Sequence, residues 1–165
     1  MTIPFIWHPS KNFNERPPAC VIDTVVLHYT DLPTAQESLQ RLCDPEAKVS
    51  AHYLIDDNGQ IYQMVLDEKR AWHAGVSHWM GRENVNDFSI GVELQNPGYN
   101  YFIANNTWQP YTKIQLEKLL TLLNFLQDRH PISTNCIVGH NHVAPGRKID
   151  PGPHFPWDFL KENLA

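Results

Sequence analysis

A run of residues that is continuously apolar near its end, where it reaches a histidine, is the sequence feature that most constrains how this chain can fold. The run covers residues 21–29, is rich in β-branched side chains, and places His28 near its carboxyl end. Continuous apolarity, in place of strict alternation, is typical of a strand that is covered on both faces. We therefore predict a buried strand at the centre of an α/β domain, with His28 at the strand's carboxyl end.

Strand-like and helix-like segments alternate along the rest of the chain. Residues 52–56 and 60–65 flank a turn sequence that contains Gly59, and they predict an antiparallel hairpin. Further strands are predicted at residues 88–94 and 136–140, helices at residues 34–43, from 112 to before Pro131 and at 157–163, and a surface loop bordering a cleft at residues 96–110. One tight hairpin combined with longer helical crossings predicts a mixed central β-sheet flanked by helices.

Length and composition favour a single globular domain. The chain has 165 residues, of which 42% are hydrophobic and 19% charged, and this is enough to bury a core without cross-links. We expect one catalytic domain over residues 1–165, with residues 1–20 as an N-terminal extension and residues 21–165 as the body. The net charge of −5 and the pI near 5.9 argue against nucleic-acid binding, which requires a clustered basic surface.

The cysteines and the N-terminus bear on the cellular compartment. Cys20, Cys43 and Cys136 are three widely separated residues, so we expect buried free thiols in place of disulfides or a thiolate metal site. The first residues lack a basic leader with a long apolar segment, and no run reaches the roughly 20 apolar residues of a membrane span. We expect a cytoplasmic protein without membrane insertion; a periplasmic location stays open if a leader has been removed.

A proline- and glycine-rich stretch over residues 139–153 contains the most suggestive chemistry. It holds His140, Lys148 and Asp150, and together with the distant His28 it offers two imidazoles and one carboxylate. Three such ligands with a fourth position open are typical of a catalytic zinc site. Each histidine alone could instead form an ordinary hydrogen bond near a strand end, and Asp150 could instead form a salt bridge with Lys148 or Arg147.

Five phrases of the sequence together resemble a known family. They are residues 26–30, 49–55, 71–75, 89–93 and 139–153, and their order and separation resemble the zinc-dependent N-acetylmuramoyl-L-alanine amidases of type 2. That family includes the AmpD- and AmiD-like recycling enzymes and is related to the peptidoglycan recognition proteins. The resemblance covers nearly all of the chain and implies the same single-domain α/β fold.

The resemblance implies a role for five residues. It implies that His28, His140 and Asp150 ligate one Zn²⁺ ion, that Glu93 handles protons, and that Lys148 stabilises the tetrahedral intermediate. These roles agree with general chemistry, since zinc activates water near neutral pH and a carboxylate can accept the proton. The alternative for Glu93 is a solvated glutamate at a strand edge.

Four further side chains have weaker assignments. His52 and His73 could orient the catalytic groups or contact substrate, although ordinary buried hydrogen bonding explains them equally well. Arg147 could bind a carboxylate of a peptide through paired hydrogen bonds. His142 stands where the family usually has aspartate, and it could compete with His140 because residues two apart on an extended segment face the same way. We keep His140 as the ligand, since it follows the glycine as in the family phrase.

The function that the resemblance implies is hydrolysis of the amide between the lactyl group of N-acetylmuramic acid, or its 1,6-anhydro form, and L-alanine. The expected partners are therefore peptidoglycan fragments or muropeptides, with no nucleic acid, and the expected state is a monomer. Two alternatives remain open at this point: a recognition module that binds zinc without catalysis, and a zinc peptidase that cuts the stem peptide.

Overall fold

The computed structural model describes residues 3–164, and it contains no helix with the length and apolarity that a membrane crossing requires. The strands are β1 (Ile6–Trp7), β2 (Phe13–Glu15), β3 (Thr24–Tyr29), β4 (Tyr53–Ile55), β5 (Ile61–Gln63), β6 (Lys69–Ala71), β7 (His78–Trp79), β8 (Arg82–Glu83), β9 (Ser89–Leu94) and β10 (Ile137–Gly139). The α-helices are α1 (Ala35–Cys43), α2 (Gly98–Asn105), α3 (Lys113–Arg129), α4 (His140–Val143) and α5 (Trp157–Asn163). Short 3₁₀ helices are η1 (Pro45–Ala47), η2 (Val85–Asp87) and η3 (Thr134–Cys136).

A mixed β-sheet forms the centre of the molecule, as the sequence predicts. Its strand order is β1-β5-β4-β9-β3-β10. The β4–β5 pair is the predicted antiparallel hairpin, whereas the other neighbouring strands run parallel. The predicted N-terminal extension is part of this architecture, because β1 joins the central sheet and β2 pairs with β6. Parallel neighbours β4, β9, β3 and β10 bring their carboxyl ends to one edge of the sheet.

The two central strands are buried on both faces. All six residues of β3 and all six of β9 are buried, which confirms the prediction from the apolar run. Val25 and Leu27 of β3 pack into the core that includes α3, whereas Val26 belongs to a second core on the other face. Since side chains alternate along a strand, His28 faces the same side as Val26, away from α3.

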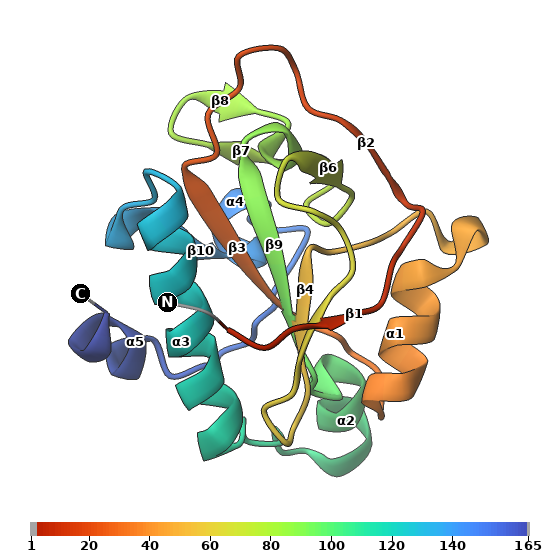
Figure 1. Ribbon diagram of the computed structural model, residues 1–165. Helices are drawn as coiled ribbons and strands as arrows, with labels where there is room; N and C mark the ends of the chain where they lie inside the picture. Colours follow the sequence, from red (N-terminus) through yellow and green to blue (C-terminus); the bar gives the residue numbers. More distant parts are fainter. Residues whose placement is uncertain (1–2, 165) are drawn as a thin grey trace.

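Helices cover both faces of the sheet. In Figure 1, α3 and α5 lie to the left of the sheet and α1 lies to its right. The α3 helix begins after Thr112, whose hydroxyl accepts a hydrogen bond from the backbone of Gln115, and its leucines at positions 119, 122, 123 and 126 are fully buried. Burying each such leucine stabilises the fold by about 1.5–3 kcal/mol. The opposite face, under α1, contains the candidate site.

Two expectations from the sequence are wrong in detail. Residues 96–110 do not form only a loop, because α2 occupies Gly98–Asn105. Proline and asparagine suggested a loop, but Pro97 precedes the helix and Asn106 ends it in a left-handed conformation, so both stand where helices tolerate them. The cysteines are free, as expected, but each of the three is partly exposed.

Candidate active site

The predicted site residues come from the carboxyl ends of neighbouring parallel strands. His28 lies near the end of β3, and Glu93 lies directly opposite it on β9. His140 follows β10, whose last residue pairs with Leu27 of β3. Asp150 returns in the loop after α4, and its carbonyl accepts a hydrogen bond from the backbone of Asn141. The sheet therefore brings together residues that are up to 122 positions apart in the chain.

Three potential ligand atoms converge on one point. The Nδ1 atoms of His28 and His140 are 3.1 Å apart. The Oδ2 atom of Asp150 lies 2.9 Å from His28 Nδ1 and 3.1 Å from His140 Nδ1. All three residues are buried, and they form a group that could hold a metal ion. We call His28, His140 and Asp150 the triangle.

The donor set and its spacing fit a divalent cation. His140 Nε2 lies 3.0 Å from the carbonyl oxygen of Ala74. A carbonyl only accepts hydrogen bonds, so this nitrogen carries the proton and His140 Nδ1 presents a lone pair to the carboxylate. Ligands at zinc–nitrogen distances in a tetrahedron are about 3.3 Å apart, close to the spacings of the triangle. Two imidazoles and one carboxylate also form a recognised catalytic zinc set.

Burial and mutual contact shift the pKa values of this group. Burial, together with the neighbouring His140, lowers the pKa of His28 to about 4, although Asp150 opposes the shift. Near neutral pH His28 is therefore a neutral imidazole, which is the form that ligates metals.

Glu93 is buried beside the triangle, and it is not the solvated residue of the alternative reading. Only 8% of its surface is exposed, and its Oε2 atom has no hydrogen-bond partner among residues 3–164. Burial, followed by the negative charge of Asp150, raises its pKa well above the usual value, whereas Lys148 opposes the shift. A carboxyl group with a raised pKa in a cleft is suited to proton transfer near neutral pH.

His73 and Ala74 lie behind the two histidines of the triangle. The Nδ1 atom of His73 is 3.1 Å from Nε2 of His28, and the carbonyl of Ala74 accepts from His140 as described above. Arg147 donates from Nη2 to the carbonyls of Ala74 and Val76, at 2.6 and 2.7 Å. Arg147 therefore stabilises the loop around residue 74 through these hydrogen bonds. Its contact with a peptide carboxylate stays a prediction.

Both ring nitrogens of His52 form hydrogen bonds with backbone groups. Its Nδ1 accepts from the backbone N–H of Gly91 at 3.0 Å, and its Nε2 lies 2.9 Å from the carbonyl of Lys69. Burial, followed by the charge of Arg16, lowers the pKa of His52 to about 4, so the ring is neutral. This arrangement fits the alternative of ordinary buried hydrogen bonding, and a contact of His52 with substrate stays a prediction.

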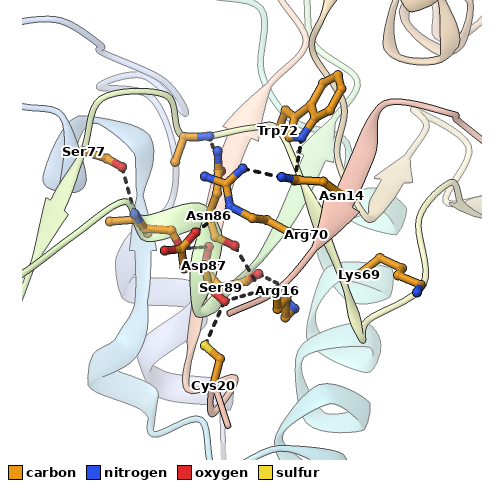
Figure 2. Close-up of polar contacts among 12 residues, drawn as sticks. Asn14, Arg16, Cys20, Lys69, Arg70, Trp72, Ser77, Asn86, Asp87 and Ser89 are labelled. Atoms are coloured by element: carbon orange, nitrogen blue, oxygen red, sulfur yellow. Dashed lines mark hydrogen bonds and ion pairs between the residues drawn. The ribbon is translucent and has the colours of Figure 1, made fainter. Parts of the chain in front are cut away.

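Arg16, from the predicted N-terminal extension, anchors the segment that leads into β9. Figure 2 shows its side chain beside Asn86, Asp87 and Ser89. The guanidinium donates to the backbone carbonyls of these three residues at 2.8 to 3.0 Å. Burial lowers the pKa of Arg16 to about 10, which leaves it charged at neutral pH. The sequence offered no local signal for this role, because the contacts join residues about 70 positions apart.

His142 does not compete with His140. A helix begins at His140, and two residues along a helix correspond to a rotation of about 200°, so the two rings point in different directions. His142 Nδ1 instead accepts from the backbone N–H of Gly139 at 2.9 Å, and its ring lies beside Trp157. The strand predicted over residues 136–140 is one residue too long at each end, since Cys136 belongs to η3 and His140 to α4. The difference at His140 removes the ambiguity.

A cleft of about 790 Å³ opens over the triangle. It is lined by the three triangle residues, Glu93 and His73, and by Arg147 and Lys148. Segments around it also contribute side chains that the sequence did not single out: Ser38, Arg41, Tyr99, Asn100 and Ile149. Tyr99 and Asn100 belong to α2, so the segment predicted to border a cleft does so. The fold and the site together define an α/β protein with a group that could hold one metal ion, placed in an open cleft.

Comparison with known proteins identifies the family. The family model described as N-acetylmuramoyl-L-alanine amidase matches residues 16–153. The chain is 39% identical over 167 residues to the 1,6-anhydro-N-acetylmuramyl-L-alanine amidase AmpD of Haemophilus influenzae, covering 90% of this chain and 86% of that protein. The chain belongs to the N-acetylmuramoyl-L-alanine amidase family, and it is an amidase.

Solved structures agree with the family and the fold. A selenomethionine derivative of AmpD superposes with a TM-score of 0.85 at 35% identity, covering 100% of this chain and 97% of the other. The amidase AmiD from E. coli, in complex with anhydro-N-acetylmuramic acid-L-Ala-D-γ-Glu-L-Lys, gives a TM-score of 0.79 at 34% identity, covering 94% of this chain and 68% of the other. The single-domain α/β architecture with a mixed sheet is therefore that of the type-2 amidases.

Proposed function

We propose that this protein hydrolyses the amide between the lactyl group of 1,6-anhydro-N-acetylmuramic acid and L-alanine in peptidoglycan fragments, as part of cell-wall recycling. The observation behind the proposal is the buried triangle of His28, His140 and Asp150 with Glu93 opposite His28. The relatives support the substrate class, since one is named a 1,6-anhydro-N-acetylmuramyl-L-alanine amidase and another forms a complex with an anhydro-muropeptide.

We propose zinc as the metal, held by His28 Nδ1, His140 Nδ1 and one carboxylate oxygen of Asp150. The nitrogen and oxygen donors, their burial and their spacing support this ion. When bound, zinc supplies Lewis acidity, which activates water and polarises a carbonyl at neutral pH.

Two side chains near the triangle, Glu93 and Lys148, have the proposed roles of proton transfer and charge stabilisation. Glu93 accepts a proton from water as the water oxygen attacks the amide carbon, and it returns a proton to the departing nitrogen when the C–N bond breaks. The products are the free carboxylate of the lactyl group and the free amine of the peptide. Lys148 donates a hydrogen bond to the oxygen that becomes negatively charged during the attack.

The proposed substrate is a soluble fragment in the cytoplasm, with the protein acting as a monomer. The cleft volume of about 790 Å³ suits a sugar with a short peptide. We propose no nucleic-acid partner, because the net charge of −5 disfavours binding to phosphates.

Product analysis tests the reaction, the bond and the metal together. The experiment incubates zinc-loaded and chelator-treated protein with anhydro-N-acetylmuramic acid-L-Ala-D-γ-Glu-L-Lys and identifies the products by mass spectrometry. We expect free tripeptide and anhydro-N-acetylmuramic acid only with the zinc-loaded protein. A cut within the peptide would instead support a stem peptidase, unchanged substrate with bound zinc would support a recognition module, and cleavage after chelation would overturn the metal mechanism.

A further inference from the structure

A continuous set of hydrogen bonds leads from the backbone of η2 to the ring of His28. The Oγ atom of Ser89 lies 2.6 Å from the carbonyl oxygen of Val85 and 3.2 Å from Nε2 of His73. On the other side of the His73 ring, Nδ1 lies 3.1 Å from Nε2 of His28. His28, His73 and Ser89 are all buried, so bulk water does not compete for these contacts.

The direction of each hydrogen bond follows from its first member. Two oxygens 2.6 Å apart require a proton between them, and a carbonyl only accepts, so the Ser89 hydroxyl donates to Val85. Its remaining lone pairs accept from His73 Nε2–H. A neutral His73 then has a bare Nδ1, which accepts from His28 Nε2–H. The Nδ1 atom of His28 is left as a lone pair directed at the triangle.

We propose that His73 and Ser89 are positioning residues that fix His28 in its Nε2–H tautomer and so direct the lone pair of its Nδ1 atom at the metal site. Nothing else within hydrogen-bond distance of His28 Nε2 can do this among the described residues, since His73 is its one contact there. In contrast, His140 obtains the same tautomer directly from the Ala74 carbonyl. Adjacent residues 73 and 74 thus orient both histidines of the triangle.

Packing and a side-chain amide hold this dipeptide in place. The Oδ1 atom of Asn86 accepts from the backbone N–H groups of His73 and Ala74, at 3.1 and 2.8 Å. Gly91 leaves room for the ring, because a Cβ atom there would lie 2.4 Å from Cγ of His73. Arg16 fastens the carbonyls of Asn86 and Ser89 from the other side, in the cluster of Figure 2. We call the hydrogen bonds from Val85 through Ser89 and His73 to His28 the relay. These contacts hold the backbone and the ring of His73 in place.

Ser89→Ala removes the acceptor of His73, and Ser77→Ala is a matched control. Ser77 is also a buried serine, and its hydroxyl contacts the carbonyl of Gly75 and the backbone N–H of Val85 without touching either ring. The readouts are the ¹⁵N chemical shifts of the imidazoles in metal-free protein, which distinguish the tautomers, and the zinc dissociation constant by competition with a chromophoric chelator.

We expect the wild-type protein and Ser77→Ala to show His28 as the Nε2–H tautomer. In Ser89→Ala we expect a mixture of tautomers and zinc binding weaker by about 10- to 100-fold, the usual effect of losing an outer partner of a ligand. Ser89→Ala with wild-type ¹⁵N shifts and wild-type zinc affinity would overturn the relay. A proton on His28 Nδ1 in the metal-free wild-type protein would overturn it too.

Two substitutions of His73 keep the test decisive if Ser89→Ala does not fold. His73→Gln can still present an oxygen acceptor to His28, and we expect it to retain most of the zinc affinity. His73→Leu has no acceptor, and we expect the full loss; equal affinities for the two variants would refute the proposal. The inference rests on the proposed zinc site, and the outcomes separate: wild-type protein that binds no zinc refutes that site, whereas zinc binding that is indifferent to these variants refutes only the relay.

Discussion

His28 and Glu93 lie directly opposite each other on the adjacent parallel strands β3 and β9. The register of the sheet therefore sets the separation between a proposed metal ligand and the proposed proton carrier. Both side chains face away from α3, toward the cleft. Because side chains alternate along a strand, a shift of β9 by one residue would turn Glu93 into the core beneath α3. The pairing of these two strands is thus a condition for the chemistry as well as for the fold.

Glu93→Gln should abolish most turnover and leave the metal site intact. The amide has the shape of the carboxyl group but cannot accept or return the proton, so we expect kcat to fall by about 10²- to 10⁴-fold. Turnover is measured by chromatography of peptide released from the anhydro-muropeptide, and zinc content by atomic emission. A variant with normal kcat would remove Glu93 from the mechanism, and a variant without zinc would indicate that Glu93 supports the metal.

Asp150→Ala should weaken zinc binding, whereas His142→Ala should not. Asp150 contacts both histidines of the triangle through Oδ2, while His142 accepts from the backbone of Gly139 and faces elsewhere. We expect the zinc affinity of Asp150→Ala to fall by more than about 100-fold, since loss of even an outer partner costs 10- to 100-fold. Competition with a chelator measures both variants, and equal effects would show that the ligand set is wrongly assigned.

Gly91→Ala should destabilise the protein through its contact with His73. The added Cβ would lie 2.4 Å from Cγ of the ring, closer than carbon atoms approach, and overpacking of this kind costs about 1–3 kcal/mol. Urea unfolding of the wild-type protein and of Gly91→Ala measures the difference. In a His73→Ala background, where the ring is absent, the same substitution should cost less. If it costs the same in both backgrounds, the clash is not its cause.

The pH dependence of stability should include a contribution from Asp67. Burial would raise the pKa of Asp67, but hydrogen bonds from His130 and Tyr53 outweigh it and lower the pKa below the usual value. A carboxyl group whose folded pKa is depressed stabilises the protein above its unfolded pKa of about 3.9, and this stabilisation is lost as pH falls toward the folded pKa.

Asp67→Asn should therefore lower the free energy of unfolding by about 2 kcal/mol near neutral pH, because charged hydrogen bonds are lost. The difference from wild type should shrink as pH falls below about 4. Urea unfolding between neutral pH and pH 3 measures it, with Glu68→Gln as the control, since Glu68 is the exposed neighbouring acid. A difference that is constant over the whole range would show that the charge of Asp67 is not involved.

Local sequence predicted the regular elements where local forces decide them. The leucine spacing between Thr112 and Pro131 predicted α3, and the apolar run to Tyr29 predicted β3. The α2 helix escaped prediction because its ends consist of residues that also form loops. The stacked rings of Phe102 and Trp108, which are 4.8 Å apart between centroids, stabilise it through packing that a local pattern does not contain.

The choice between His140 and His142 as metal ligand also could not be made from the local sequence pattern. An extended segment would have placed both rings on one face, and only the start of α4 at His140 separates them. The relay through His73 and Ser89 was also beyond the sequence, because its hydrogen bonds join residues 45 and 16 positions apart.

The sequence by itself determined the α/β class, the central buried strand and, through its family resemblance, the identities of the residues with chemical roles. Only the tertiary structure decided which atoms of those residues face one another, which histidine joins the triangle and which groups hold each ring from behind. The physical reason is the distance along the chain over which each interaction acts. Helix and strand formation depend on neighbours along the chain, whereas a ligand set depends on atoms about 3 Å apart whose positions are fixed by the register of the sheet and the packing on its two faces.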